Sequence, residues 1–339
     1  MSEPAFADLV DLACERLGGA VLLANDEFFA PKESLLKPGA PVWREDAYTE
    51  RGKWMDGWET RRRRTPGHDW CVVRLGLPGV VRGVIVDTSF FRGNFPEACS
   101  LEGIEVEGVP DPVALASDAP GAAPVAGGGA SWHELVARTP LAGDARNAFT
   151  VAGEHRVTHL KLRIFPDGGV ARLRVHGEAR PDAARLARGR VVDLAAMENG
   201  GFVVLCSDMF FGHRQNLILP GRSTHMGDGW ETRRRRGPGH DWSIVRLAAR
   251  GSVERIELDT DHFKGNAPGS CSLERCDAAG VEPSALPGGV RWLPLLPETP
   301  LQPHARHAWD VSGAAATHVR LNIFPDGGVA RLRLIGTIA

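Results

Sequence analysis

The stretch DGWETRRRRTPGHDW, residues 56–70, recurs as DGWETRRRRGPGHDW at residues 228–242 with one difference. Around it, residues 56–102 align with residues 228–274 without a gap, and about 29 of 47 positions are identical by direct comparison. The flanking sequence has diverged, while fourteen of these fifteen residues have not. The chain therefore contains the same domain twice, and the arginine string is under a constraint that both copies share.

Other parts of the two copies pair as well, which extends the duplication to most of the chain. We expect an N-terminal helical segment at residues 1–20, a first repeat at 21–178, a connector at 179–200 and a second repeat at 201–339. The connector is rich in Ala, Arg and Asp, which is typical of a linking segment with a helical turn or two. The further matching pairs are NDEFFAPKESLL (25–36) with SDMFFGHRQNLI (207–218), and LRIFPDGGVARLRV (162–175) with LNIFPDGGVARLRL (321–334).

The bulk composition is that of an ordinary globular protein. The 339 residues include 40 basic and 42 acidic side chains, so the net charge of −2 argues against a protein that binds nucleic acid through a global positive field. No apolar run is long enough to span a membrane. The six cysteines form no CxxC pairs and are expected to be reduced thiols. We expect a cytoplasmic protein.

Short apolar runs separated by Gly, Pro and Asp indicate β-strands. CVVRLG (71–76) and VTHLKLRIF (157–165) are rich in β-branched residues, and the second alternates apolar with basic side chains. The following PDGG and the alternating VARLRV (170–175) suggest a hairpin. Many short strands in repeats of this length predict an all-β protein made of two tandem two-sheet sandwiches, each a jelly roll.

Two segments need separate treatment. SWHELV (131–136) matches a helix-start pattern, but its partner RWLPLLPETP (291–300) contains Pro294 and Pro297, so we predict strands in both. Near the N-terminus, apolar side chains recur at helical spacing and Gly18-Gly19 follows, which predicts one short helix there. The apolar positions of that helix would be Phe6, Leu9, Val10, Ala13 and Leu17.

The four arginines would alternate between two faces of an extended chain. One pair could hold an anionic substrate while the other forms ion pairs with Asp56, Glu59 or Asp69, because the planar guanidinium binds carboxylates through two parallel hydrogen bonds. A buried ion-pair lattice that holds loops or the two units together is the alternative. For substrate binding we select Arg61 and Arg63, with Arg233 and Arg235 in the second repeat.

Further polar residues are repeated around the arginine string. His68-Asp69 and His240-Asp241 each place an imidazole beside a carboxylate. The chain has no serine elbow, phosphate-binding glycine loop or HExxH helix. No cofactor is required by these motifs, and a divalent metal stays open. Polar residues at the end of one strand in each repeat complete the candidate set: Asp87, Thr88, Asn94, Asp259, Thr260 and Asn266.

The long strings FFAPKESLL, WMDGWETRRRRTPGHDWCVVRLG, VDTSFFRGNFPEACSLEG and LRIFPDGGVARLRV resemble the allantoicase family over nearly the whole chain. The resemblance implies two jelly-roll domains of the galactose-binding type. It also implies hydrolysis of allantoate to (S)-ureidoglycolate and urea, as part of allantoin degradation, by an enzyme expected to be a homo-oligomer. Neither nucleic acid nor a membrane is implied as a partner.

For that reaction an arginine fork would anchor the carboxylate of allantoate, and a general acid must protonate the departing urea nitrogen. The second repeat differs from the first at several positions, for example His262 in place of Phe90, so two equal active sites are not expected. A non-catalytic jelly roll that binds a small ligand is the alternative function. The candidates for the acid and base are Glu59, His68, Asp69, Glu231, His240 and Asp241.

Overall fold

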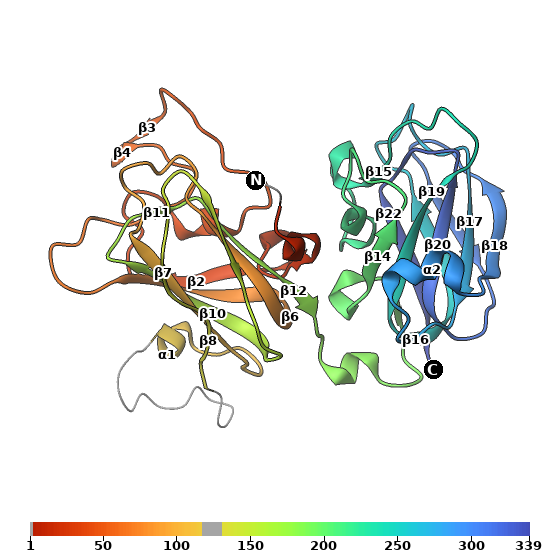
Figure 1. Ribbon diagram of the computed structural model, residues 1–339, viewed down its shortest axis with the longest axis horizontal. Coiled ribbons are helices and arrows are strands. Elements are labelled where there is room, and N and C mark those ends of the chain that lie inside the picture. Colours follow the sequence, from red (N-terminus) through yellow and green to blue (C-terminus); the bar gives the residue numbers. More distant parts are fainter. Residues whose placement is uncertain (1–2, 117–130) are drawn as a thin grey trace. The chain divides into compact units, whose positions relative to one another are not determined.

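The computed structural model describes residues 3–116 and 131–339 (Figure 1). The chain divides into two compact units, unit 1, Met1–Arg180, and unit 2, Pro181–Ala339. Each unit is built around an eight-stranded antiparallel sheet system, with only short helices between the strands. The predicted all-β fold with two tandem sandwiches is confirmed.

One long strand in each unit makes the sandwich. In unit 1 this is β6, Asp69–Asp87. Its first half pairs with β2 and β10, and its second half pairs with β12 and β9. Pro78, which has no backbone N–H to donate, lies between the two halves. A strand that passes from one sheet to the other closes the two layers over a shared core.

The remaining strands extend these two layers outward. Beyond β10 lie β7 and then β8, and beyond β12 lies β1. Burial alternates from residue to residue along β9, as a period of two requires, whereas most residues of β6 are buried. The bounds in unit 1 are β1 Val10–Asp11, β2 Ala20–Ala24, β7 Ala98–Ile104, β8 His133–Pro140, β9 Arg146–Thr150, β10 Arg156–Phe165 and β12 Arg172–Ala179.

Unit 2 repeats this topology strand for strand around β16, Asp241–Asp259. Strands β8 and β18 are both extended, so the strand prediction for SWHELV and its proline-containing partner is confirmed. The bounds in unit 2 are β13 Val191–Asp193, β14 Phe202–Cys206, β17 Ser270–Cys276, β18 Leu293–Pro300, β19 Arg306–Asp310, β20 Ala316–Phe324 and β22 Arg331–Ile338.

Small elements connect these strands and carry the loops at the ends of the sandwiches. The hairpin of β3 and β4 belongs to unit 1, and among the described residues each unit has one short α-helix. These elements are β3 Tyr48–Thr49, β4 Gly52–Lys53, η3 Lys32–Leu36, α1 Pro112–Ala116, η4 Ala183–Leu186, η6 Arg214–Ile218, η7 Met226–Asp228, η8 Pro283–Ala285 and α2 Leu286–Gly289.

The predicted hairpin around PDGG is wrong. Strands β10 and β12 do not pair with each other, because β6 lies between them and pairs with both. The short strand β11, Gly169–Val170, instead pairs with β5, Trp58–Glu59, at the start of the arginine string. The same arrangement joins β21, Gly328–Val329, to β15, Trp230–Glu231. The PDGG segment therefore anchors the repeated signature.

The predicted N-terminal helix is also wrong. The segment forms two 3-10 turns, η1 (Ala5–Asp8) and η2 (Glu15–Leu17), separated by β1, which pairs with β12. The Asp11 carboxylate accepts hydrogen bonds from the backbone N–H groups of Ala13 and Val175, which stabilises an extended chain in the middle of the segment. Strand pairing and this polar contact override the helical spacing of the apolar residues.

The connector prediction needs a related correction. Strand β13 pairs with β22, and η5 (Met197–Asn199) follows it, so residues 191–200 repeat the β1–η2 segment inside unit 2. The sequences DLACERLGG and DLAAMENGG, which begin at Asp11 and Asp193, carry this match. A Cβ at Gly19 would lie 1.8 Å from the Ala13 carbonyl oxygen, and one at Gly201 would lie 2.1 Å from that of Ala195. Close backbone approach requires the second glycine in both copies.

All six cysteines are free, as expected. Within the described residues, none of the helices combines the length and the apolar character needed to cross a membrane.

Candidate active site

The arginine string has two kinds of members. Arg61 Nε lies 2.6 Å from Asp26 Oδ2, and Arg63 Nη1 lies 2.6 Å from Asp69 Oδ1. In contrast, Arg62 and Arg64 are exposed and form no hydrogen bond or ion pair with any of the residues that the structure describes. Alternate arginines thus point to different surroundings, and the pair at 61 and 63 is the one that binds carboxylates.

Unit 2 repeats this division. Arg233 binds Asp208 at 2.9 Å, and Arg235 forms an ion pair with Asp241. Of the three carboxylates predicted to pair with the arginine string, Asp69 does so. Asp56 is wrong, because its Oδ2 lies 2.6 Å from Arg172 Nη2. Glu59 is also wrong, because its partner is an amide.

That amide belongs to Asn94, whose Nδ2 donates to Glu59 Oε1 at 2.6 Å. Glu59 lies on β5, and Asn94 lies in the loop that follows β6, so pairing of β5 with β11 brings together residues far apart in the chain. Burial raises the pKa of the Glu59 carboxyl, and the Asn94 amide opposes that rise by stabilising the carboxylate. This carboxyl is held in its protonated form to a higher pH than an ordinary glutamate.

The Glu59–Asn94 pair lines a hollow of about 390 Å³ in unit 1. Two cations face it, Lys53 from β4 and Arg92 from the loop after β6. Hollows of a few hundred cubic ångströms with convergent polar groups are typical of small-molecule sites. The other lining side chains are Phe29, Trp43, Met55 and Phe90.

The two cations are held loosely. The Lys53 ammonium lies 4.8 Å from the Trp43 ring centroid and 4.9 Å from that of Tyr48. Arg92 Nε lies 3.0 Å from Asp144 Oδ2, while 80% of the Arg92 side chain is exposed. Both retain donor N–H groups that can turn toward an anion in the hollow.

The loop that forms one wall is strained. Phe90 has a φ of 70°, a conformation that is costly for an aromatic residue, and its backbone N–H donates to Asp144 Oδ1 at 2.8 Å. Its counterpart His262 has a φ of 72° and donates to His304 Nδ1 at 2.9 Å. Both copies therefore hold this turn in the same unusual conformation by a side-chain acceptor.

In unit 2 the Glu–Asn pair is present but covered. Asn266 donates to Glu231, and the Met226 sulfur lies 3.3 Å from the same amide nitrogen. Glu231 is only 8% exposed. A shorter loop explains the difference, since residues 39–55 separate Pro38 from Asp56 in unit 1, whereas only residues 221–227 separate Pro220 from Asp228 in unit 2.

The extra residues of unit 1 lie in the part of the loop that supplies Trp43 and Lys53. The sequence prediction missed both residues, and it also missed Phe90 and Arg92. An insertion in one copy beside an otherwise repeated signature is the signal that could have identified the loop, because it changes what surrounds a shared pair.

The other predicted residues lie outside the lining of this hollow. Asp69 binds Arg63 and accepts from Asn25 Nδ2 at 2.7 Å. Asp241 makes the equivalent contacts with Arg235 and Ser207. These two aspartates hold the arginine string against the preceding loop.

The two histidines pack on aromatic rings. The His68 ring centroid lies 5.0 Å from that of Phe165, and the His240 centroid lies 4.6 Å from that of Phe324. His240 Nε2 also lies 3.2 Å from Asn322 Oδ1. The acid–base roles of both histidines stay predictions.

The strand-end residues stabilise local backbone. Asp87 Oδ1 accepts from the backbone N–H of Ser89 at 2.8 Å, and Asp259 Oδ1 accepts from Asp261 at 2.7 Å. Thr88 and Thr260 are fully buried, and each hydroxyl hydrogen bonds to carbonyl groups of the loop opposite. Of the predicted strand-end residues, only Asn94 lines the hollow of unit 1.

In residues 3–116 and 131–339, no group of three or more His, Cys, Asp or Glu side chains is placed to hold a metal ion.

Comparison with known proteins gives one consistent family. A family model described as the allantoicase repeat matches residues 10–180 and 192–339. A probable allantoicase of Burkholderia mallei is 48% identical over 97% of this chain and 94% of its own length. The allantoicase of Dictyostelium discoideum is 44% identical over 97% and 87%. The crystal structure of allantoicase from Saccharomyces cerevisiae superposes with a TM-score of 0.78 at 33% identity, covering 96% of this chain and 92% of that one.

Proposed function

Because this chain belongs to the allantoicase family, it hydrolyses allantoate in purine degradation, and we propose that the reaction takes place in unit 1 at the Glu59–Asn94 hollow. The observation that carries this assignment is a half-buried carboxyl with a raised pKa that faces two cations across an open hollow. The family relationship favours an enzyme over the non-catalytic binding module. The products are urea and (S)-ureidoglycolate.

The substrate has one carboxylate and two ureido groups on the same carbon. In our proposal Lys53 and Arg92 hold the carboxylate, since both cations line the hollow and both keep free donors. The rings of Phe29 and Phe90 exclude water from the reacting carbon. This orientation directs one ureido group toward Glu59.

Urea is a poor leaving group unless its nitrogen is protonated. Glu59 donates its proton to the ureido nitrogen as the bond from that nitrogen to the central carbon breaks. The lone pair of the second ureido nitrogen forms a double bond to the carbon, and urea leaves. Asn94 fixes the carboxyl group in place throughout, through its 2.6 Å hydrogen bond.

Water then adds to the same carbon. The Glu59 carboxylate takes a proton from the attacking water, the hydroxyl group is bonded to carbon, and the electrons of the double bond return to the second ureido nitrogen, which has kept its own proton throughout. One water molecule is consumed and one urea is released for each allantoate. Glu59 ends protonated, ready for the next cycle.

In this proposal the repeated arginines and aspartates hold the backbone around Glu59 in place and do not contact the substrate. Arg61 holds Asp26, and the Asp26 carbonyl oxygen accepts from Trp58 Nε1 at 2.8 Å, directly before Glu59. Arg63 and Asp69 fix the other end of the string. The substrate-binding roles of Arg61, Arg63, Arg233 and Arg235 stay predictions, as does a homo-oligomeric, cytoplasmic enzyme.

The matched pair Glu59→Gln and Glu231→Gln tests the assignment. Both carboxyls bind an asparagine, so both variants make the same chemical change. We expect E59Q to lower the rate of urea release by about 10²- to 10⁴-fold, the usual contribution of a general acid. E231Q should leave it within a few-fold. A fully active E59Q, or an E231Q that loses activity while still folded, would place the chemistry elsewhere.

A further inference from the structure

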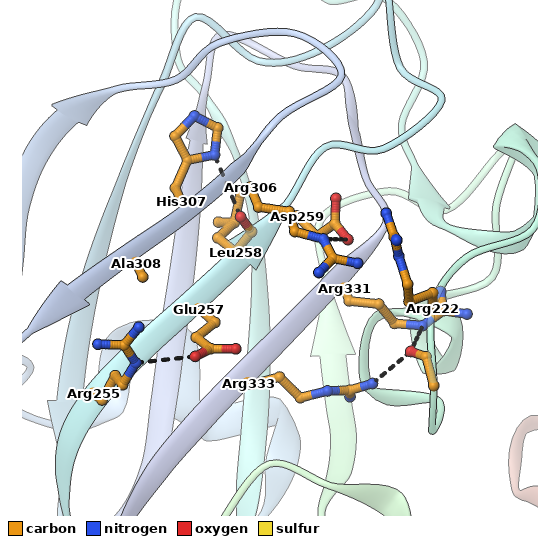
Figure 2. A pocket seen from close by; sticks show the side chains of 11 residues that line it. Arg222, Arg255, Glu257, Leu258, Asp259, Arg306, His307, Ala308, Arg331 and Arg333 are labelled. Carbon is orange, nitrogen blue, oxygen red and sulfur yellow. Dashed lines mark hydrogen bonds and ion pairs between the residues drawn. The ribbon is translucent and has the colours of Figure 1, made fainter.

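Unit 2 has an open, charged hollow of about 460 Å³ on the face of its sheet, away from Glu231 and Asn266 (Figure 2). The floor of the hollow is formed by side chains that the strand register places next to one another. Asp259 of β16 pairs with Arg306 of β19 on one side and with Arg331 of β22 on the other. Two residues along, Glu257 pairs with Ala308 and with Arg333 in the same order. Residues two apart on a strand share a face, so these six side chains form one surface.

Unit 1 has nearly the same floor. Asp87 pairs with Arg146 and Arg172, and the next row contains Ala148 and Arg174, so five of the six residues are identical. The remaining position is Ile85 in place of Glu257. The two floors therefore share three arginines that can bind a carboxylate, while Glu257 adds a negative charge in unit 2.

In unit 1 the chain itself occupies this surface. The Glu3 carboxylate binds both terminal nitrogens of Arg146. The Phe6 ring packs on Gly83, where a Cβ would lie 2.2 Å from the ring, and also against His176. Arg146 therefore shows what this position does when a carboxylate is available: it takes it in a two-point contact.

In unit 2 the equivalent cover is missing. Arg255 stands where Gly83 lies in unit 1, so its side chain excludes a ring such as that of Phe6. The side chain of Arg306, the counterpart of Arg146, is 53% exposed and donates no hydrogen bond to any residue of the described chain. Its Nε forms two long ion pairs, 3.5 Å from Asp259 Oδ2 and 3.9 Å from Asp261 Oδ2. The terminal nitrogens of Arg306 are the donors that a ligand could bind.

A second donor points to the same conclusion. Arg333 bonds the carbonyl groups of Leu219 and Gly221 through Nη2, and its Nε lies 3.6 Å from Asp193 Oδ2. Its buried Nη1 has no hydrogen-bond partner among the described residues, as is also the case for Nη1 of the unit 1 counterpart Arg174. A buried guanidinium nitrogen without an acceptor costs free energy that a bound anion or water would recover. Within the hollow, Arg255 pairs with Glu257 at 3.0 Å, so a ligand carboxylate would bind at Arg306 and Arg333, whose own carboxylate neighbours lie 3.5 Å or more away.

The hollow also offers acceptors. Glu257 lies in the middle of the floor and is exposed, with Asp259 in the adjacent row. Guanidinium groups recognise a carboxylate, whereas these carboxylates accept N–H groups. A small molecule with one carboxylate and several amide N–H donors matches both. Figure 2 shows these donors and acceptors side by side, with Arg306 beside Asp259 and Arg255 beside Glu257.

We propose that this hollow of unit 2 is a second, non-catalytic binding site for ureido carboxylates, centred on Arg306. The ligand class rests on the proposed function, because the enzyme's substrate and product both carry a carboxylate and ureido N–H groups. Glu231 and Asn266 do not line the hollow, so it holds the ligand without an acid to cleave it.

Calorimetric titration with hydantoate (N-carbamoylglycine) tests the proposal. This probe has one carboxylate and one ureido group but lacks the second ureido group that the reaction needs. We expect the wild-type chain to bind two equivalents. Arg306→Gln should lose one of them, with at least a tenfold weaker affinity at that site, and should release urea from allantoate at the wild-type rate.

Arg146→Gln is the matched control, since it makes the same change at the position where Glu3 already fills the guanidinium. It should leave both equivalents in place. The Lys53→Gln, Arg92→Gln double variant should remove the other equivalent, and its failure to do so would count against the proposed catalytic hollow alone. A single equivalent in the wild type that persists in R306Q, or two equivalents in a folded R306Q, would overturn the second site, and so would loss of urea release in R306Q.

Discussion

Unit 1 and unit 2 share a Glu–Asn pair and a row of Arg, Asp and Arg on one face of the sheet, and they differ in which of the two is exposed. In unit 1 the Glu–Asn pair opens into a hollow with two cations, while the Arg–Asp–Arg face, formed by Arg146, Asp87 and Arg172, is covered by the N-terminal segment. In unit 2 the Glu–Asn pair is covered by Met226, while the Arg–Asp–Arg face is open. Short segments outside the repeated strands decide which surface each unit presents, so duplication of the fold did not duplicate the exposure of the Glu–Asn pair.

The two units should respond alike to loss of the buried ion pair made by the first aspartate of each repeated string. Among the variants considered, this loss should lower the free energy of unfolding the most. Arg172 binds Asp56, and Arg331 binds Asp228, with all four side chains almost fully buried. Because a buried carboxylate would be left without its partner, Arg172→Ala and Arg331→Ala should each lower the free energy of unfolding by about 3–5 kcal/mol. Urea-induced unfolding measures both.

Lys37→Ala is the control for that experiment, because it removes the half-exposed second partner of Asp56 and should cost no more than about 1 kcal/mol. A large loss in only one of the two arginine variants would show that the units do not share this support.

The cations of the hollow should distinguish the units. Lys53→Gln and Arg92→Gln each remove a charged donor from the proposed carboxylate site, which should lower kcat/KM for allantoate by about 10- to 100-fold. Most of the change should be in KM, because the carboxylate keeps its charge through the reaction. Lys264→Gln, at the counterpart of Arg92 in unit 2, should leave kcat/KM unchanged; equal losses in all three variants would contradict a single catalytic unit.

Asn94 allows a sharper test through pH. Its amide stabilises the Glu59 carboxylate and so lowers a pKa that burial raises. Asn94→Ala removes that stabilisation, and the pKa of Glu59 should rise further. If the protonated form releases urea, kcat falls as pH increases through this pKa, so the alkaline limb of the kcat profile should move to higher pH in N94A. Asn266→Ala should leave the profile in place, and an N94A limb that moves toward acid would contradict the role of Glu59.

The smallest effect is expected at the exposed ends of the arginine strings. Arg61 and Arg233 make the same exposed ion pair, with Asp26 and Asp208. Arg61→Ala and Arg233→Ala should each cost less than about 1 kcal/mol in unfolding free energy. A loss of urea release of 100-fold or more in R61A, with R233A active, would restore Arg61 as a substrate-binding residue.

Much of the fold could be predicted because it depends on short-range patterns. Alternation of apolar and polar residues predicted the strands, and proline at Pro294 and Pro297 correctly excluded a helix. The hairpin at PDGG failed because strand pairing is decided by a third, distant strand, β6, which inserts between β10 and β12. The N-terminal helix failed for the same reason, since pairing with β12 competes with local helical spacing.

For the site, the repeated signature indicated Glu59 and Asn94 as candidates but could not separate them from Asp69, Thr88 or His68. All five are equally invariant between the copies. Only the contacts divide them, since Asp69 and Thr88 satisfy buried or local groups while the Glu59 carboxyl faces a hollow.

The sequence by itself determined the duplication, the all-β class, the family and a short set of polar candidates, because these follow from composition, periodicity and long identical strings. The tertiary structure alone decided which copy of each surface is open. That difference depends on where an inserted loop and an N-terminal segment come to rest on the sheets, and such long-range packing leaves no periodic pattern in the chain.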